Sequence, residues 1–432
     1  MGHGNGAQRN GASRERAILV GVVLPGASVE DVADHLEELE RLAETAGAGV
    51  VERIIQERGR LDAATFIGRG KAEHVASRCR ALKADLVIFD DDLSAAQVKN
   101  LENLIEAKVI DRSGLILDIF ARRARSREAR TQVELAQLEY LLPRLTRRWT
   151  HLSRQVGGIG VRGIGETQIE LDRRLVRRRI ARLKEDLSRI ERGRQVRRIA
   201  RQGIPKGALI GYTNSGKSTL LNALTRAEAF VEDRLFATLD PLVRRMELPG
   251  GRSVLLIDTV GFIRKLPHHL VASFHSTLEE AADADFFLHI VDLSHPRYEE
   301  HLAVTNQVVA ELGADSRPVI LVFNKLDRAE PGAVERARRL HPDAVFISAS
   351  RGLHLDAVVA RLSGLVEDEL VERSIRLYSR DAAAIARVYD QAAVLDAAYH
   401  DGYVDLTFRA SRARAAALAR LEAGSGAGET GS

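Results

Sequence analysis

The stretch Ala208-Leu-Ile-Gly-Tyr-Thr-Asn-Ser-Gly-Lys-Ser-Thr219 contains the spacing Gly211-x-x-x-x-Gly216-Lys217-Ser218. Apolar residues before Gly211 predict a buried strand, and a helical pattern begins at Thr219. A glycine-rich turn in this context lets backbone N–H groups converge on phosphate oxygens, while the lysine reaches the β and γ phosphates and the serine hydroxyl ligates Mg²⁺. An ordinary glycine turn would not require Lys-Ser after the second glycine. The stretch therefore predicts a phosphate-binding loop.

Two segments further along the chain indicate which base is bound. Asn324-Lys-Leu-Asp327 follows an apolar run, which places it at the carboxyl end of a predicted strand, where open α/β sheets bind ligands. The carboxylate of Asp327 can accept both N1–H and the 2-amino group of guanine, whereas adenine offers neither donor. Ser348-Ala-Ser350 follows the apolar run 344–347 and fits a loop that closes over the base. The expected nucleotide is GTP.

The segments between these loops supply candidate groups for the γ phosphate and the metal. Asp258-Thr-Val-Gly261 follows a predicted strand, so Asp258 can hold Mg²⁺ through water and the Gly261 N–H can meet the γ phosphate. Thr238 is the candidate for a second Mg²⁺ hydroxyl. Phe262 stands where many GTPases carry a Gln that orients the attacking water. An aromatic ring cannot do this by hydrogen bonding, so we expect slow intrinsic hydrolysis that needs help from a bound partner.

These segments define the predicted site. Catalysis is assigned to Lys217, Thr238 and Gly261, and Mg²⁺ to Ser218, Thr238 and, through water, Asp258. The residues expected to contact GTP are Gly211, Tyr212, Thr213, Asn214, Ser215, Gly216, Lys217, Ser218, Thr219, Asp258, Gly261, Asn324, Lys325, Asp327, Ser348, Ala349 and Ser350.

The composition limits the classes of protein to which the chain could belong. The chain has 432 residues, with 45% hydrophobic and 29% charged residues and a net charge of +4, which suggests about three globular domains. Cys79 is the only cysteine, so no intramolecular disulfide is possible and a reducing cytoplasm is expected. No apolar stretch approaches the ~18 residues of a membrane span, and we expect a monomer without membrane insertion.

Residues 17–127 are expected to form a small parallel α/β domain. Predicted strands 17–24 and 86–89 alternate with predicted helices 29–46 and 71–82. Ile67-Gly-Arg-Gly-Lys71 lacks the spacing of a phosphate loop and is interpreted as a turn. Asp90-Asp-Asp92 could hold a metal, but adjacent side chains diverge in extended chain, so a solvated or helix-capping role is preferred.

Residues 128–202 predict an antiparallel pair of helices, 128–145 and 171–199, because apolar residues recur there at helical spacing. From Arg173 to Arg198 there are twelve Lys or Arg against three Asp or Glu, an imbalance that favours a phosphate backbone over a solvated face. The loop 157–166 between the helices holds five glycines around Arg162 and can approach RNA closely. The expected RNA contacts are Arg162, Arg173, Arg174, Arg177, Arg178 and Arg182.

The predicted fold class is α/β. A P-loop GTPase domain, with a mostly parallel sheet and helices on both faces, spans 203–371. It is preceded by the small α/β domain with its long helical hairpin. A small α+β domain, 372–422, follows, and its role is not evident. Residues 1–16 and 423–432 are expected to be disordered tails.

The chain resembles the HflX family of ribosome-associated GTPases over roughly residues 18–370. The resemblance implies GTP hydrolysis coupled to binding of the large ribosomal subunit and its RNA, and splitting of stalled or idle ribosomes under stress. An Asn at position 214 further implies K⁺ near the phosphates. The motifs that carry the resemblance are Ile67-Gly-Arg-Gly-Lys71, Phe89-Asp-Asp-Asp92, Asp111-Arg-Ser-Gly-Leu-Ile-Leu-Asp-Ile-Phe120, Gln132-Val-Glu-Leu-Ala-Gln-Leu-Glu-Tyr-Leu-Leu-Pro143, Gly165-Glu-Thr-Gln168, Asp258-Thr-Val-Gly-Phe-Ile-Arg-Lys-Leu-Pro-His268 and Thr277-Leu-Glu-Glu280.

Two other functions are open at this stage. One is a GTP-switched factor for ribosome assembly, in which hydrolysis only resets the protein. The other is an RNA-remodelling ATPase that uses the amino-terminal domain. Ribosome-splitting assays would separate the first from a splitting factor, and ATP turnover that survives Lys217→Ala would support the second.

Overall fold

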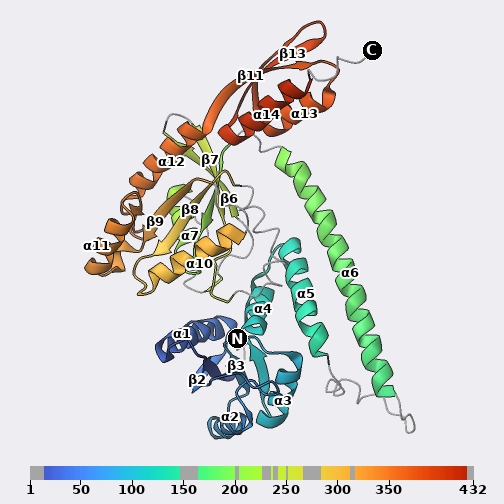
Figure 1. Ribbon diagram of the computed structural model, residues 1–432, viewed down its shortest axis with the longest axis vertical. Coiled ribbons are helices and arrows are strands. Elements are labelled where there is room, and N and C mark those ends of the chain that lie inside the picture. The colour runs from blue at the N-terminus through green and yellow to red at the C-terminus, as the bar shows by residue number, and fades with distance from the viewer. Residues whose placement is uncertain are drawn as a thin grey trace, which may run out of the picture. The chain divides into compact units, whose positions relative to one another are not determined.

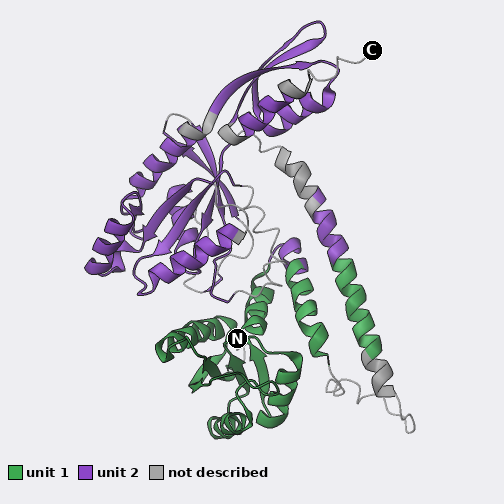
Figure 2. Cartoon of the chain, in the orientation of Figure 1, with its two compact units in different colours: residues 1–124, 132–183 green, residues 125–131, 184–432 purple. Residues whose placement is uncertain are grey.

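The computed structural model describes residues 14–145, 164–199, 204–225, 235–236, 242–249, 252–265, 284–311 and 317–425. Their contacts divide the chain into two compact units, residues 1–124 with 132–183 and residues 125–131 with 184–432 (Figure 2). Two of the predicted site residues, Arg162 and Thr238, lie outside the described residues, as do the glycine loop up to residue 163 and both ends of the chain.

The amino-terminal region, coloured blue to teal in Figure 1, is a four-stranded parallel sheet. Its strand order is β2-β1-β3-β4. Ser28 and Ser94 begin two of its helices with capping boxes. The serine side chain accepts the backbone N–H of the third helical residue, whose own side chain accepts the serine backbone N–H. The expected parallel α/β fold is confirmed. Its elements are β1 (Arg16–Val23), α1 (Val29–Ala46), β2 (Gly49–Glu57), α2 (Arg69–Leu82), β3 (Leu86–Phe89), α3 (Ala95–Ile105), β4 (Lys108–Asp111) and α4 (Arg112–Arg123).

The first of the three aspartates after β3 differs from the expectation. Asp90 is buried, and its carboxylate pairs with the Arg112 guanidinium at 2.7 Å, so it is neither solvated nor a helix cap. Burial places the two charges in a low-dielectric environment, where each needs a charged partner, and Arg112 also pairs with Glu38. The helix cap is Asp111 at the end of β4, whose side chain accepts the Gly114 N–H at the start of α4. Among the described residues no cluster of His, Cys, Asp or Glu could hold a metal ion.

The basic region forms two helices, α5 (Arg127–Leu141) and α6 (Ile164–Ile199). A 3₁₀ turn, η1 (Leu142–Arg144), ends the first helix where Pro143 removes a backbone donor. The two helices are held together by a bidentate pair from Arg179 to Glu134, at 2.7 and 2.8 Å. The predicted hairpin is confirmed, but α6 begins at residue 164, so the last residues of the predicted glycine loop are helical.

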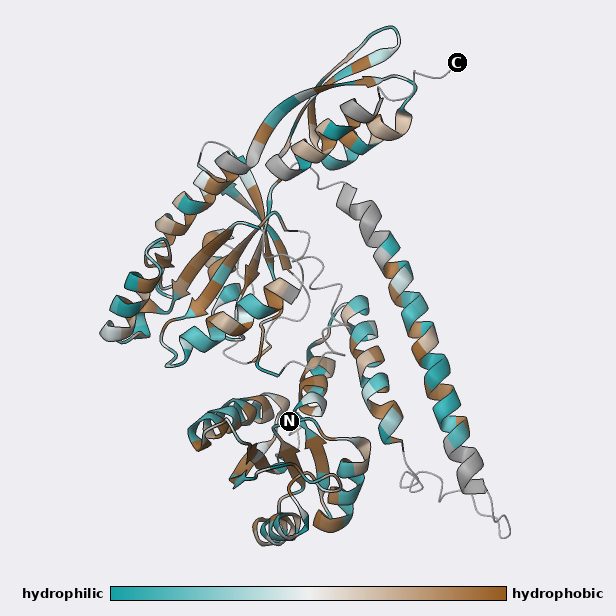
Figure 3. Cartoon of the chain, viewed as in Figure 1, coloured by the Kyte–Doolittle hydropathy of each residue, from teal (hydrophilic) through white to brown (hydrophobic). Residues whose placement is uncertain are grey.

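The nucleotide-binding region contains a six-stranded sheet in the order β10-β9-β8-β5-β7-β6, in which only the β6–β7 pair is antiparallel. Apolar clusters cover both of its faces, and Figure 3 shows its central strands as strongly hydrophobic. The expected mostly parallel sheet is confirmed. Its elements are β5 (Lys206–Ile210), α7 (Lys217–Thr225), β6 (Leu242–Leu248), β7 (Arg252–Asp258), β8 (Phe286–Asp292), α10 (Tyr298–Glu311), β9 (Val319–Asn324), η3 (Leu326–Arg328), α11 (Pro331–Leu340), β10 (Val345–Phe346) and α12 (Leu355–Glu369).

The carboxy-terminal region is an antiparallel sheet in the order β11-β13-β12, packed on two helices through a core that includes Leu377, Val388 and Phe408. This confirms the expected α+β character. Its elements are β11 (Leu370–Tyr378), α13 (Ala382–Gln391), β12 (Ala393–Tyr399), β13 (Tyr403–Ser411) and α14 (Arg412–Ser425). In the described part of the chain, no helix combines the length and apolar character that crossing a membrane requires.

Candidate guanine-nucleotide site

The phosphate loop joins the carboxyl end of β5 to the first residue of α7. Two of its glycines have positive φ angles, 148° at Gly211 and 94° at Gly216. A Cβ at Gly211 would lie 2.2 Å from the Ile290 carbonyl oxygen, and one at Gly216 would lie 2.2 Å from the Asn324 amide nitrogen. Both contacts are closer than real Cβ atoms allow, so only glycine lets the loop approach its neighbours this closely.

Lys217 is buried beneath this loop. Its ammonium donates to the carbonyl oxygens of Gly211 at 3.1 Å and Tyr212 at 2.9 Å. An ammonium carries three N–H groups, so this anchorage leaves one for a phosphate oxygen. Burial lowers the pKa of Lys217 to about 8, with the nearby Asp258 carboxylate acting in the opposite direction. A bound polyphosphate would therefore restore the charged form of this lysine.

The predicted base-binding residues are joined to one another and to the phosphate loop. The Asn324 side-chain amide donates to the Ser215 carbonyl at 2.9 Å and accepts the Ala349 N–H at 3.0 Å. The Ser348 hydroxyl donates to the Asp327 carboxylate at 2.6 Å and holds the pKa of that carboxyl below its usual value. Asp327 therefore remains a charged acceptor, as pairing with guanine requires.

Three further residues predicted to contact the nucleotide are Lys325, Ser350 and Asn214. The Lys325 ammonium pairs with Asp292 at 2.7 Å, and its backbone has a left-handed φ of 62°. Ser350 is exposed, and its hydroxyl lies 3.4 Å from that of Ser348. Asn214, at the tip of the phosphate loop, is also exposed and has a φ of 60°.

Two oxygen groups meet where the metal is expected. The Ser218 hydroxyl donates to the Asp258 carboxylate at 2.5 Å, and Asp258 is buried at the end of β7. Hydroxyl and carboxylate oxygens are the hard ligands that Mg²⁺ prefers beside phosphate, so the donor set fits this ion. GTPases as a class use Mg²⁺, which neutralises charge that develops on the phosphates. These two residues would hold it here.

The segment after Asp258 lies directly against the phosphate loop. The Phe262 N–H donates to the Gly211 carbonyl at 3.1 Å, and the Phe262 carbonyl accepts the Thr213 N–H at 2.6 Å. A Cβ at Gly261 would lie 2.6 Å from the Thr213 Cα, so no larger residue fits there. The Phe262 side chain is 2% exposed and packs into the core with Ile210 and Phe287. The aromatic ring thus anchors this segment and does not face the nucleotide.

Sequence reasoning missed two features of the site. Tyr212 was predicted only as a nucleotide contact, but its side chain packs on α10, its ring stacked on that of His301. His289 is buried in β8 near Lys217, and burial lowers its pKa to about 3, with the Lys217 charge as the second cause. A single polar residue inside the apolar run 286–291 was the available signal for this histidine.

Comparison with known families agrees with this site. Family models match the chain over residues 33–121 (GTP-binding GTPase N-terminal), 123–201 (GTP-binding GTPase Middle Region) and 206–325 (50S ribosome-binding GTPase). Fold and site together define a P-loop GTPase, an enzyme that hydrolyses GTP. The chain is 48% identical to GTPase HflX of Caldanaerobacter subterraneus over 84% of its own length and 82% of that protein. The chain belongs to the HflX family, whose GTPases are of the ribosome-associated type.

A second curated relative shows the same similarity. GTPase HflX of Escherichia coli K12 is 42% identical over 91% of this chain and 93% of that protein. Among solved structures, a GTP-binding protein from Sulfolobus solfataricus in complex with GDP aligns with a TM-score of 0.44 and 24% identity, over 82% of this chain and 99% of that chain.

Proposed function

We propose that this GTPase docks on the RNA of the large ribosomal subunit and couples its nucleotide cycle to splitting and recycling of stalled or idle ribosomes. In this proposal Lys217 and Gly261 contact the phosphates, and Ser218 and Asp258 hold Mg²⁺. Asn324, Lys325 and Asp327 select guanine, with support from the loop 348–350. The name of the matched family model, 50S ribosome-binding GTPase, supports the choice of subunit.

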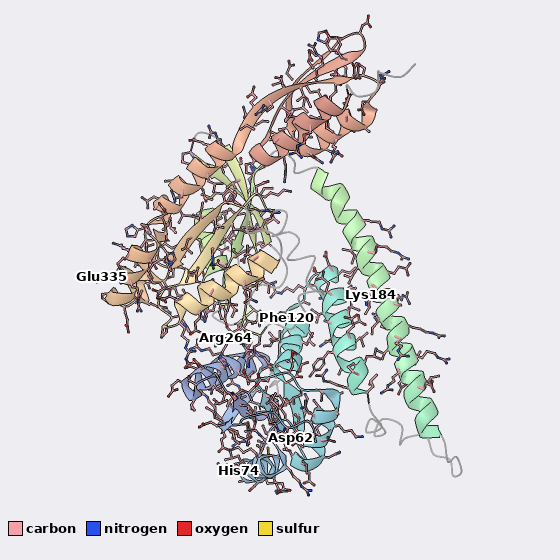
Figure 4. All side chains as sticks on the ribbon, viewed as in Figure 1. Asp62, His74, Phe120, Lys184, Arg264 and Glu335 are labelled. Carbon is pink, nitrogen blue, oxygen red and sulfur yellow. The ribbon has the colours of Figure 1, made fainter. Side chains whose placement is uncertain are left out.

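The observation that carries the proposal is an arginine stripe on α6, which consists of Arg174, Arg177, Arg178 and Arg182. These positions are three or four residues apart and therefore share one face of the helix. All four are exposed, and among the described residues none of them has an acidic partner. Figure 4 shows long side chains projecting along α6.

Neighbouring basic residues on the same helix behave differently. Arg179 pairs with Glu134 of α5, and Arg189 pairs with Glu185 one turn away. Between them Leu183 is buried, which fixes the face of α6 that packs inside its unit. Arg173 donates to the Leu145 carbonyl at 2.9 Å, so it supports the hairpin as well as adding positive charge. Arg173 and Arg179 thus bind the hairpin itself, and the stripe stays available for phosphates.

Docking on the subunit would also assist catalysis at the nucleotide site. Phe262 is buried in the core, so this position supplies no group that orients water. A subunit that completes or stabilises the catalytic geometry would accelerate hydrolysis. We expect purified large subunits to raise GTP turnover at least tenfold, which corresponds to about 1.4 kcal/mol of activation free energy.

The test compares turnover with and without large subunits for the wild type and for Arg177→Glu/Arg178→Glu/Arg182→Glu. The variant should lose the stimulation and keep basal hydrolysis, because the stripe lies outside the nucleotide site. A sucrose-gradient assay of intact ribosomes then measures splitting directly. Binding and stimulation without dissociation would favour the assembly-factor role instead.

A matched control reverses three basic residues on α2, Arg69, Lys71 and Arg80. The control makes the same change in net charge on a different helix. It should retain subunit-stimulated turnover. Equal stimulation of the α6 variant would show that the stripe is only a solvated face.

A further inference from the structure

The Tyr212 hydroxyl accepts a hydrogen bond from the Arg264 backbone N–H at 2.9 Å. Tyr212 follows the first glycine of the phosphate loop, and Arg264 stands three residues after Gly261. Together with the two backbone hydrogen bonds between Phe262 and the loop, this bond ties the residues that follow Gly261 to the phosphate loop. We define the catalytic-segment tether as Tyr212, Phe262 and Arg264.

The Tyr212 ring is itself held in place by α10. It stacks on the His301 imidazole with 3.7 Å between ring centroids and 4° between the ring planes. His301 is also buried and packs against His295, with 4.3 Å between their centroids. A parallel stack of this kind leaves the phenol little freedom to rotate away from Arg264.

A second contact joins the same segment to the same helix. The Arg264 guanidinium donates to the Glu300 carboxylate at 2.8 Å, and Glu300 also lies 3.5 Å from Arg297. Figure 4 labels Arg264, which extends from the segment after β7. The first turn of α10 therefore holds Arg264 in two ways. Glu300 binds its side chain, and His301 orients the Tyr212 ring whose hydroxyl accepts its backbone N–H.

We propose that Tyr212 is a positioning residue for GTP hydrolysis, which presets the Gly261 segment against the phosphate loop through Arg264 and is itself oriented by His301. The Tyr212 side chain does not contact the reacting atoms. It fixes the backbone whose Gly261 N–H meets the γ phosphate, so its effect is specific to the triphosphate. GDP lacks that phosphate and should be bound independently of the tether.

This positioning role is important because residue 262 is Phe and not a Gln that orients water. In a GTPase without a water-orienting Gln, the transition state depends more heavily on groups that are already in place. A backbone donor whose following residues are already held against the phosphate loop costs little reorganisation when charge develops on the γ phosphate. The inference rests on GTP hydrolysis, which family membership assigns, and it is independent of ribosome docking.

The decisive variant is Tyr212→Phe in the full chain, which keeps the ring and its stack on His301 but removes the hydroxyl acceptor. Single-turnover GTP hydrolysis without ribosomes should fall about tenfold. Affinity for a non-hydrolysable GTP analogue should fall as well, while GDP affinity stays within about twofold, measured with fluorescent nucleotides. A merely structural role would weaken the two nucleotides alike.

His301 and Tyr298 provide the comparison. His301→Ala removes the stack and should reproduce the triphosphate-selective loss, whereas His301→Phe retains a ring and should restore most of the rate. Tyr298→Phe removes a phenol from the same helix; Tyr298 packs on Phe323 with 5.9 Å between ring centroids, so this matched control should leave hydrolysis unchanged. An unchanged rate for Tyr212→Phe, or parallel losses of GDP and GTP-analogue affinity, would overturn the proposal.

Discussion

The Tyr140 hydroxyl of the helical hairpin donates a hydrogen bond to the Asp111 carboxylate of the amino-terminal sheet at 2.8 Å. Asp111 is fully buried and also accepts from the backbone N–H groups of Leu93 and Gly114. Arg144 donates to the same carboxylate at 2.9 Å and lies over the Tyr140 ring at 3.6 Å. Burial and the Asp111 charge raise the pKa of Tyr140, so the phenol remains a donor. One carboxylate therefore joins the hairpin to the sheet.

Tyr140→Phe should loosen this junction by about 1–2 kcal/mol, because a buried hydrogen bond is lost while the ring is retained. The measurement is hydrogen–deuterium exchange in the full chain, which should show faster exchange of α5 amides. Gly114→Ala should have a larger effect, since its Cβ would lie 2.7 Å from the Tyr140 hydroxyl oxygen. Peptides from the carboxy-terminal sheet serve as the internal control. Unchanged exchange of α5 would contradict the role assigned to Asp111.

The sequence places the predicted nucleotide loops at the ends of buried strands, where the structure also has them, because each loop is a short local segment. Sequence reasoning failed for Asp90, whose partner Arg112 lies 22 positions away at the start of α4. A run of three acidic residues does not reveal that one of them is buried. The Arg112 guanidinium reaches Asp90 because β4 lies beside β3 and ends next to it.

The helix α6 begins earlier than the predicted helix 171–199 for a related reason. Gly165 lies in a glycine-rich stretch whose local preference is a loop, yet it is helical. Tertiary structure overrides such propensities. The sequence also does not reveal where the Tyr212 ring packs. The phosphate-loop spacing fixes its backbone, but contact with α10 determines the position of the ring.

The preference for one base over another tests whether the Asp327 carboxylate contacts guanine. Asp327→Asn should shift preference from GTP toward xanthosine triphosphate, because an amide can donate to the 2-oxygen of xanthine. Competition of the two nucleotides against fluorescent GDP measures the ratio. The Ser348 hydroxyl, which donates to Asp327, can rotate to serve the amide oxygen, so folding should be preserved. A variant that kept the wild-type preference for GTP would place the guanine contact elsewhere.

Monovalent cations should affect turnover through Asn214. Its exposed position at the tip of the phosphate loop suits a residue that helps to hold K⁺ beside the phosphates, where the ion would offset developing charge. We expect faster hydrolysis in K⁺ than in Na⁺ at equal ionic strength. Asn214→Ala should remove the difference between the two salts. Equal rates for the wild type would exclude a role for K⁺.

Proton linkage should accompany nucleotide binding. Burial lowers the pKa of Lys217 to about 8, whereas bound phosphates favour its charged form and raise that pKa. Binding of GDP at pH 8 should therefore take up roughly half a proton, and the uptake should vanish near pH 6, where the lysine is already protonated. Calorimetry in two buffers of different ionisation enthalpy measures the uptake. Proton release at pH 8, or no exchange, would show that Lys217 is charged before binding.

Salt dependence gives the most direct count of the phosphates that the α6 stripe engages. Each phosphate contact adds close to one unit to the slope of log affinity against log salt concentration, because a counterion is released. The Arg177→Glu/Arg178→Glu/Arg182→Glu variant should therefore bind large subunits more weakly, with a slope shallower by about two to three units. Co-sedimentation at several salt concentrations measures both quantities. The α2 control should keep the wild-type slope, since general charge alone does not set the number of contacts. Weaker binding of the α6 variant with an unchanged slope would mean that the stripe supports the hairpin and contacts no phosphate.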